Sequence, residues 1–327
     1  MTKLIKARLN LFATQTTALP GLSDEMKVFY SDYLIDMAEP ELVHDQFGQK
    51  KPIPKKGGKT IEFRKYDSLA KAMTPLTEGV TPAGNALNVS TITATVAQYG
   101  DFIELSDVLL LTAIDNNLVE ATRLLGSQAG RTLDTVTREV LNGGSNVMYA
   151  QGGASRSALT QANNKLTVDD IRKAVRVLKK FNAPRINGDY CAIIHPDVAY
   201  DLMSDPAWKA PHEYKDTTNL YEGEIGKIAG VRFVETTEAK IFGKAAGSNA
   251  VDVYSTLVMG ADAYGVTEIT GGGLQHIVKQ LGSAGTADPL NQRATAGWKA
   301  MKTAERLVEQ YMVRIESCST FNDIHNN

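Results

Sequence analysis

Three residues close together in the sequence have side chains that could act together in hydrolysis. Cys191, His195 and Asp197 are, by type, the nucleophile, base and orienting acid of a thiol hydrolase. Such catalysis requires a nucleophile within hydrogen-bonding reach of its base. The flanking residues favour another interpretation, in which Cys191 lies in a buried strand over residues 190–194 and His195 and Asp197 begin a helix. We therefore expect structural roles, and a cytoplasmic cysteine hydrolase is the alternative of a different class.

Two glycine-containing segments have the wrong spacing for a phosphate-binding loop. Residues 126–132 are one residue short of the P-loop spacing, have Arg in place of Lys, and fall inside a predicted helix. Residues 223–230 lack both the G-x-G start and the preceding strand of the dinucleotide fingerprint. The five histidines are scattered, with no His-x-x-x-His and no paired cysteines. We expect no enzymatic activity, no cofactor and no metal.

Length and charge limit the class of protein. A chain of 327 residues exceeds one typical domain, so two lobes are expected. A net charge of -2 argues against a dedicated nucleic-acid binder, and any DNA contact should be weak and patchy. The two distant cysteines fit a reducing cytoplasm. No apolar run approaches the roughly 18 residues of a membrane span, so no membrane partner is expected.

The elements around these residues predict an assembly protein. Residues 59–66 and 92–96 alternate apolar and polar side chains, which predicts a β-hairpin. The connection over residues 67–88 is interpreted as polar, is far longer than an ordinary hairpin loop, and carries turn-forming residues at 75, 79, 82, 84 and 85. Ordering it costs about 1–2 kcal/mol per residue, more than burial of a few apolar side chains returns. We expect this arm to be mobile or to bury its apolar face on a neighbouring molecule.

A long amphipathic helix follows the hairpin. Apolar residues recur every three or four positions from Leu118 to Val140, and residues 142–144, Asn-Gly-Gly, provide a stop. The helix should span about 39 Å. Gly126 and Gly130 lie inside it, which favours close packing of a crossing backbone, with a bend during assembly as the alternative. Residues 142–164 read as a linker to an α+β lobe with a mixed or antiparallel sheet. This lobe should open with a helix that Thr167 and Asp170 cap, with apolar residues from Ile171 to Phe181 facing inward.

Several segments resemble the major capsid proteins of tailed bacteriophages, which have the Hong Kong 97-type fold, and most closely the N-four-type coat protein subfamily. The resembling segments are 57–64 (Gly-Gly-Lys-Thr-Ile-Glu-Phe-Arg), 75–82 (Pro-Leu-Thr-Glu-Gly-Val-Thr-Pro), 92–101, 105–108, 128–141, 193–196 (Ile-Ile-His-Pro), 226–234, 297–299 (Gly-Trp-Lys) and 313–316 (Val-Arg-Ile-Glu). The resemblance covers nearly the whole chain, and its first segment is the most specific.

The resemblance implies an α+β fold with five parts. They are an N-terminal arm (1–48), an extended hairpin loop (49–98), a peripheral strand, spine helix and linker (99–165), an axial domain (166–265), and C-terminal strands shared between domains (266–327). Intersubunit contacts are expected at Ile61, Phe63, Arg64, Glu78, Ile92 and Val96, and close spine-helix packing at Gly126 and Gly130. No lysine–asparagine cross-linking motif can be matched.

The implied function is a major capsid protein, with an encapsulin-like compartment shell as the alternative. Members of the family form hexamers and pentamers that tile an icosahedral virion around double-stranded DNA. Further expected partners are a portal, a separate scaffold and decoration proteins. Assembly is expected in the host cytoplasm.

Overall fold

The computed structural model describes residues 42–54, 56, 58–66, 69–81, 84–112, 117–208, 224–243, 251–268, 273–283 and 288–321. Of the N-terminal arm expected over residues 1–48, residues 1–41 lie outside the described residues. The chain divides into two compact units, as expected from its length. Unit 1 comprises residues 1–42, 98–133 and 272–301, and unit 2 comprises residues 43–97, 134–271 and 302–327.

Unit 1 packs one half of a helix on a sheet. Its elements are β4 (Ala97–Ser106), α3 (Asp107–Thr112), the first part of α4 (Asn117–Asn142), β12 (Gln275–Lys279) and the first part of β13 (Arg293–Arg306). Both β4 and β12 pair with β13. Leu125, Ala129 and Leu133 of α4 pack on small side chains and Trp298 of β13. The alanines of β13 leave room for the helix, and the Trp298 indole N–H donates to the Gln128 side chain over 3.2 Å.

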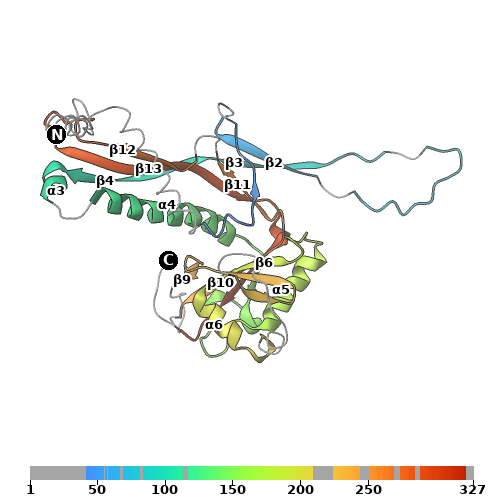
Figure 1. Ribbon diagram of the computed structural model, residues 1–327. Helices are drawn as coiled ribbons and strands as arrows, with labels where there is room; N and C mark the ends of the chain where they lie inside the picture. The colour runs from blue at the N-terminus through green and yellow to red at the C-terminus, as the bar shows by residue number, and fades with distance from the viewer. Residues whose placement is uncertain are drawn as a thin grey trace, which may run out of the picture. The chain divides into compact units, whose positions relative to one another are not determined.

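Unit 2 contains a seven-stranded mixed sheet in the order β5-β14-β10-β6-β8-β7, with β9 paired to β10 (Figure 1). Its strands are β5 (Val147–Tyr149), β6 (Tyr190–Ile194), β7 (Glu224–Ile228), β8 (Val231–Glu235), β9 (Ile241–Phe242), β10 (Val253–Met259) and β14 (Met312–Ser317). Its helices are α5 (Val168–Lys180) and α6 (Pro196–Ser204). The prediction that residues 142–164 form a linker between two lobes is therefore wrong. These residues belong to unit 2 and include β5, which pairs with β14.

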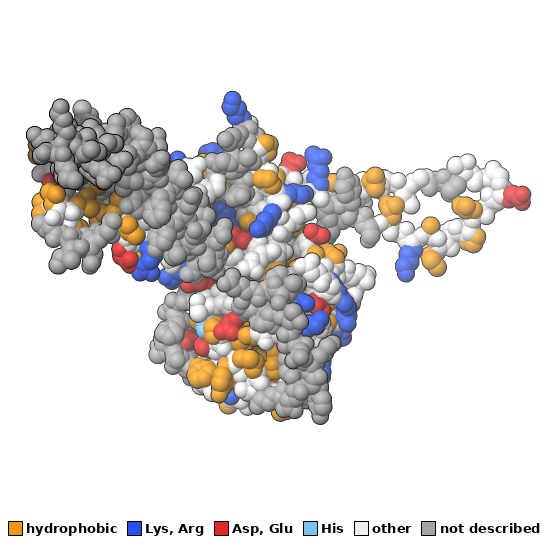
Figure 2. Space-filling model, in the orientation of Figure 1, with side chains coloured by type: hydrophobic (Ala, Val, Ile, Leu, Met, Phe, Trp, Pro, Cys, Tyr) orange, Lys and Arg blue, Asp and Glu red, His pale blue; other side chains and the backbone are white. Residues whose placement is uncertain are grey.

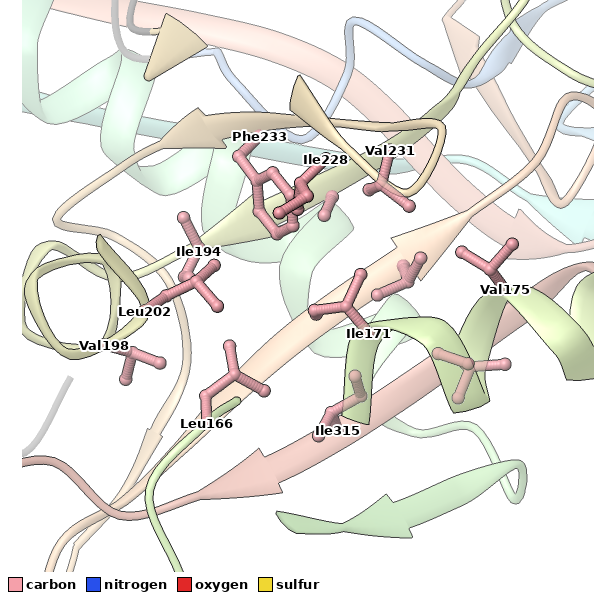
Figure 3. Close-up of a cluster of buried hydrophobic side chains, with 14 of the residues drawn as sticks. Leu166, Ile171, Val175, Ile194, Val198, Leu202, Ile228, Val231, Phe233 and Ile315 are labelled. Atoms are coloured by element: carbon pink, nitrogen blue, oxygen red, sulfur yellow. The ribbon is translucent and has the colours of Figure 1, made fainter. Parts of the chain in front are cut away.

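The core of this sheet is a continuous apolar cluster (Figure 3). Ile171 and Val175 of α5 meet Ile194 of β6 and Phe233 of β8, all with exposed fractions below 5%. The Thr167 side chain caps α5 through a capping box with Asp170, as the sequence predicts. Phe181, expected to point inward, is exposed, because it lies just beyond the last turn of the helix.

The second half of α4 buries polar rather than apolar side chains. Val136 and Val140, expected on the buried stripe, are only partly buried, whereas Asp134 and Thr137 are fully buried. The backbone N–H of His44 donates to Asp134 over 2.8 Å, and the His44 Nδ1 lies 2.6 Å from the same carboxylate. Both His44 and Asp134 lose their hydrogen bonds to water when they are buried, and the hydrogen bonds between them compensate for that loss.

Asp45, the residue after His44, extends this group of buried polar side chains. Asp45 accepts a hydrogen bond from Thr137 over 2.7 Å and pairs with the ammonium of Lys302 on β13. The hydroxyl of Tyr264, on β11 (Tyr264–Glu268), donates to the His44 carbonyl. Burial raises the pKa of Tyr264 well above its ordinary value, so this donor keeps its proton. The strand β1 (Gln49–Lys50) then pairs with β11, which fixes the chain just before the hairpin.

Arginines from distant strands cap the C-terminal end of α4. The last carbonyls of a helix lack intrahelical partners and carry a partial negative charge. Arg306 of β13 donates to the Val140 carbonyl over 3.1 Å, and Arg314 of β14 donates to the Asn142 carbonyl. The helix itself has no basic residue in its last turn. Its end is therefore stabilised by side chains more than 160 residues later in the chain.

The buried His44–Asp134 pair should contribute strongly to stability. Replacing Asp134 by Ala leaves two buried His44 nitrogens without their acceptor, so we expect a loss of about 3–5 kcal/mol in the free energy of unfolding. Urea unfolding followed by circular dichroism measures it. The control Asp169→Ala removes an exposed carboxylate of α5 and should change the free energy little. Equal effects of the two substitutions would contradict this role.

Candidate assembly interface

The predicted hairpin is confirmed. Strands β2 (Thr60–Tyr66) and β3 (Val89–Thr95) pair antiparallel over seven residues, from Thr60↔Thr95 to Tyr66↔Val89. The backbone N–H of Val96 continues the pairing by donating to the Lys59 carbonyl over 2.9 Å. The β-branched residues of β3 suit this extended ribbon.

The base of the hairpin is fixed within the chain by one close contact. A Cβ on Gly265 of β11 would lie 2.7 Å from the Phe63 ring, so only glycine lets the ring rest on this strand. Phe63, Ala94 and Val96 have exposed fractions of 4%, 0% and 8%. The expectation that this apolar face needs a neighbouring molecule is therefore wrong at the base, where the chain covers it.

The loop beyond the base is different, because its apolar side chains are uncovered. Residues 69–88, described except for 82 and 83, have no helix or strand and lead away from β2 and β3 (Figure 1). The exposed large side chains of this loop are Leu69, Met73, Leu76, Val80 and Leu87, with exposed fractions from 57% to 80%. Hydrophobic side chains stand along both arms of the loop (Figure 2). Such a concentration of exposed apolar side chains is typical of an interaction surface.

The expected contact residues fall into two groups. Arg64 and Glu78 are exposed, and Ile61 and Ile92 are partly exposed, so all four remain accessible. Glu78 lies in the turn of the loop where the Val80 N–H donates to the Thr77 carbonyl, with Gly79 at φ +79°. Phe63 and Val96 are buried by the same chain and are not accessible in this conformation.

The sequence analysis missed the apolar side chains of the loop. Leu69, Met73, Leu76 and Val80 recur every three or four residues in a segment that turn-forming residues led us to treat as polar. Pro75 and Gly79 interrupt any helix there, so this spacing buries nothing within the loop. The presence of five large apolar residues in a segment without predicted helix or strand could have indicated an interaction surface.

Gly126 and Gly130 are both buried on α4, on the same side as Leu125 and Ala129. Burial agrees with close packing at these positions. Whether the helix bends there during assembly stays a prediction.

The possible catalytic residues do not form a hydrolase site. Cys191 is fully buried on β6, and residues four apart on a strand are roughly 13 Å apart, too far for a bond to His195. His195 instead caps α6 by accepting from the Asp197 N–H over 3.2 Å. Asp197 accepts from the Tyr254 hydroxyl over 2.8 Å. The structural interpretation of these residues is confirmed.

The described residues hold no group of three or more His, Cys, Asp or Glu side chains arranged to bind a metal ion. Within the same residues, none of the helices is both long and apolar enough to cross a membrane. Burial raises the pKa of the other cysteine, Cys318, to about 11, which keeps it a thiol at neutral pH.

Comparison with known proteins shows the family to which the chain belongs. A family model described as phage capsid protein matches residues 4–287. The chain belongs to the phage capsid protein family. No curated protein matches the sequence. Membership makes the chain a structural protein of the virion that assembles with copies of itself, rather than an enzyme.

Solved capsid structures share its fold. The capsid of Ralstonia phage GP4 has a TM-score of 0.67 at 14% identity and covers 87% of this chain and 90% of its own. The capsid of cyanophage P-SCSP1u has a TM-score of 0.64 at 15% identity, covering 85% and 88%. The SrpI encapsulin of Synechococcus elongatus matches less well, with a TM-score of 0.55 at 9% identity, covering 86% and 89%. The capsid protein therefore has the Hong Kong 97-type fold.

The Phe63–Gly265 contact gives a direct test of the hairpin base. Gly265→Ala places a methyl group against the Phe63 ring, so we expect the capsid protein to lose about 1–3 kcal/mol of stability. Adding Phe63→Leu should recover part of that loss, because the two positions are in contact. Urea unfolding of both variants measures the coupling.

Gly84→Ala is the matched control, since a Cβ there meets nothing within 4 Å. A loss of stability in this control as large as in Gly265→Ala would show that the contact is not the cause.

Proposed function

We propose that the chain is the subunit of hexamers and pentamers that form the icosahedral head of a tailed phage around double-stranded DNA. The hairpin loop lies over an adjacent copy and buries its apolar side chains there. Arg64, Glu78, Ile61 and Ile92 contribute to that contact. The observation that carries this proposal is the loop itself, whose large apolar residues have no cover within the part of the chain that the structure describes.

Burial of its apolar side chains provides a driving force for contact between the loop and a neighbour. Burying each of its five large apolar side chains would contribute about 1.5–3 kcal/mol. The fixed hairpin base reduces the cost of assembly, because only the loop must be ordered when a neighbour binds. A repeated head-to-tail contact closes into a ring when the rotation between successive copies adds up to a full turn.

The finer assignments are part of the same proposal. In family terms, residues 1–48 form the arm, 49–98 the extended loop, 99–142 the peripheral strand and spine helix, and 166–265 the axial domain. The C-terminal strands in 266–327 are shared between domains. A portal, a separate scaffold and decoration proteins complete the head, which is assembled in the host cytoplasm. Close packing at Gly126 and Gly130 positions the spine helix.

An encapsulin-like compartment is the second candidate, because the SrpI encapsulin shares the fold. The two shells differ in what they enclose, a genome or a protein cargo. A portal or terminase gene beside the gene for this chain would favour the phage head.

Electron microscopy of the protein expressed alone tests the proposed function. We expect rings or closed shells, because the loop supplies a contact that each copy can repeat. A chain that stays monomeric at high concentration, with and without crowding agents, would count against it.

A deletion tests the role of the loop. Residues 67–88 are replaced by Asn-Gly, which suits the Tyr66↔Val89 pair as a two-residue hairpin turn. We expect the variant to keep the circular dichroism spectrum and unfolding midpoint of the parent, because the base is fixed by Phe63, but to form no shells in negative-stain images. Global unfolding would instead show that the loop belongs to the core.

Substitutions that keep the loop length sharpen this test. Leu76→Ser with Val80→Ser removes apolar surface and should reduce particle yield. Thr77→Ser with Thr81→Ser changes exposed polar positions of the same loop and should leave the yield unchanged. Equal yields from both pairs would contradict burial of the apolar side chains in the contact.

A further inference from the structure

The solvent face of α5 carries a concentration of positive charge that neither the fold nor the shell contact explains. Residues 169–188 contain six Lys or Arg and two Asp, in a chain whose net charge is -2. The basic residues are Arg172, Lys173, Arg176, Lys179, Lys180 and Arg185, and all are exposed. We call them the α5 basic face. Lys and Arg side chains gather at the right-hand edge of the part that carries α5 (Figure 2).

Local structure accounts for only some of these charges. Lys173 pairs with Asp169 over 2.8 Å and with Asp170 over 3.4 Å. Lys179 and Lys180 lie in the last turn, where cations complement the helix dipole. Arg172 and Arg176 are in neither position. Arg172 is attracted to Asp169 at longer range, but among the described residues no ion pair at direct contact involves either arginine. Their guanidinium groups are therefore available to an external anion.

Of the two negative charges of α5, one is withdrawn from this face. Asp170 is buried in the capping box with Thr167, whereas Asp169 is exposed and its charge is balanced by Lys173, whose hydrogen bond lowers the pKa of Asp169. Arg172 and Arg176 are one turn apart, about 6 Å along the helix axis, and Lys179 continues the row. Such a row of flexible cations can follow a phosphate backbone without reading bases.

We propose that the α5 basic face contacts the phosphate backbone of double-stranded DNA, weakly and without sequence preference. This rests on the proposed function, which places DNA inside the shell. An acidic surface of a neighbouring copy is the competing partner.

Salt dependence of DNA binding tests the proposal. Unassembled full-length protein is titrated into a fluorescein-labelled 30-base-pair duplex of arbitrary sequence, and anisotropy is read between 50 and 200 mM NaCl. Each neutralised phosphate contributes about 0.9 to the slope of log affinity against log salt. The variant R172Q/R176Q/K179Q should therefore bind more weakly, with a slope smaller in magnitude by about 3.

The matched control is K50Q/K56Q/K59Q, which removes three exposed positive charges from the basic segment before the hairpin. This control should keep most of the parent's slope of log affinity against log salt. The variant R172K/R176K, which keeps both charges, should bind DNA as the parent does. An unchanged slope in the α5 variant, or an equal loss in both triple variants, would overturn the proposal. Circular dichroism confirms that each variant is folded before it is compared.

Shell formation by the same variants separates the remaining explanations. We expect R172Q/R176Q/K179Q to form shells as the parent does. If it forms none while its DNA affinity is unchanged, the α5 basic face is a contact between copies and the proposal is wrong. If the parent chain itself forms no shells but binds DNA through α5, the proposed function fails while the DNA contact stands.

Discussion

The contact between the Phe63 ring and the backbone of Gly265 determines what the hairpin can do. It fixes the base of β2 and β3 on β11, so the two strands are held by their own chain. Beyond this point the loop has no cover among the described residues and exposes its large apolar side chains. A fixed base with an exposed apolar loop presents the same geometry from every copy, which suits the proposed contact between copies.

Elements with strong local patterns could be predicted from the sequence. The alternation around Phe63, the stripe from Leu118 to Leu133 and the Thr167 cap each depend on residues near one another in the chain, and the structure has the hairpin, α4 and α5 there. The buried polar half of α4 could not be predicted, because the partners of Asp134 and Thr137 are His44 and Asp45, about ninety residues earlier.

Strand β13 was missed for a related reason. Its alanines have low strand propensity, and only packing against α4 and pairing with three other strands make residues 293–306 extended. At the candidate interface, the turn-forming residues of the loop were recognised, but its apolar side chains were not. Whether these side chains are exposed depends on how the rest of the chain folds around the loop, and this cannot be read from the residues of the loop alone.

The last strand of the chain, β14, lies inside its sheet, between β5 and β10. Its Arg314 also caps the end of α4. A chain cut before residue 312 would therefore lack an interior strand, and not merely an edge, and β5 would lose its connection to β10. Because both partners of β14 come much earlier in the chain, this sheet cannot close from local contacts alone, and folding of the unit requires a contact of high sequence separation.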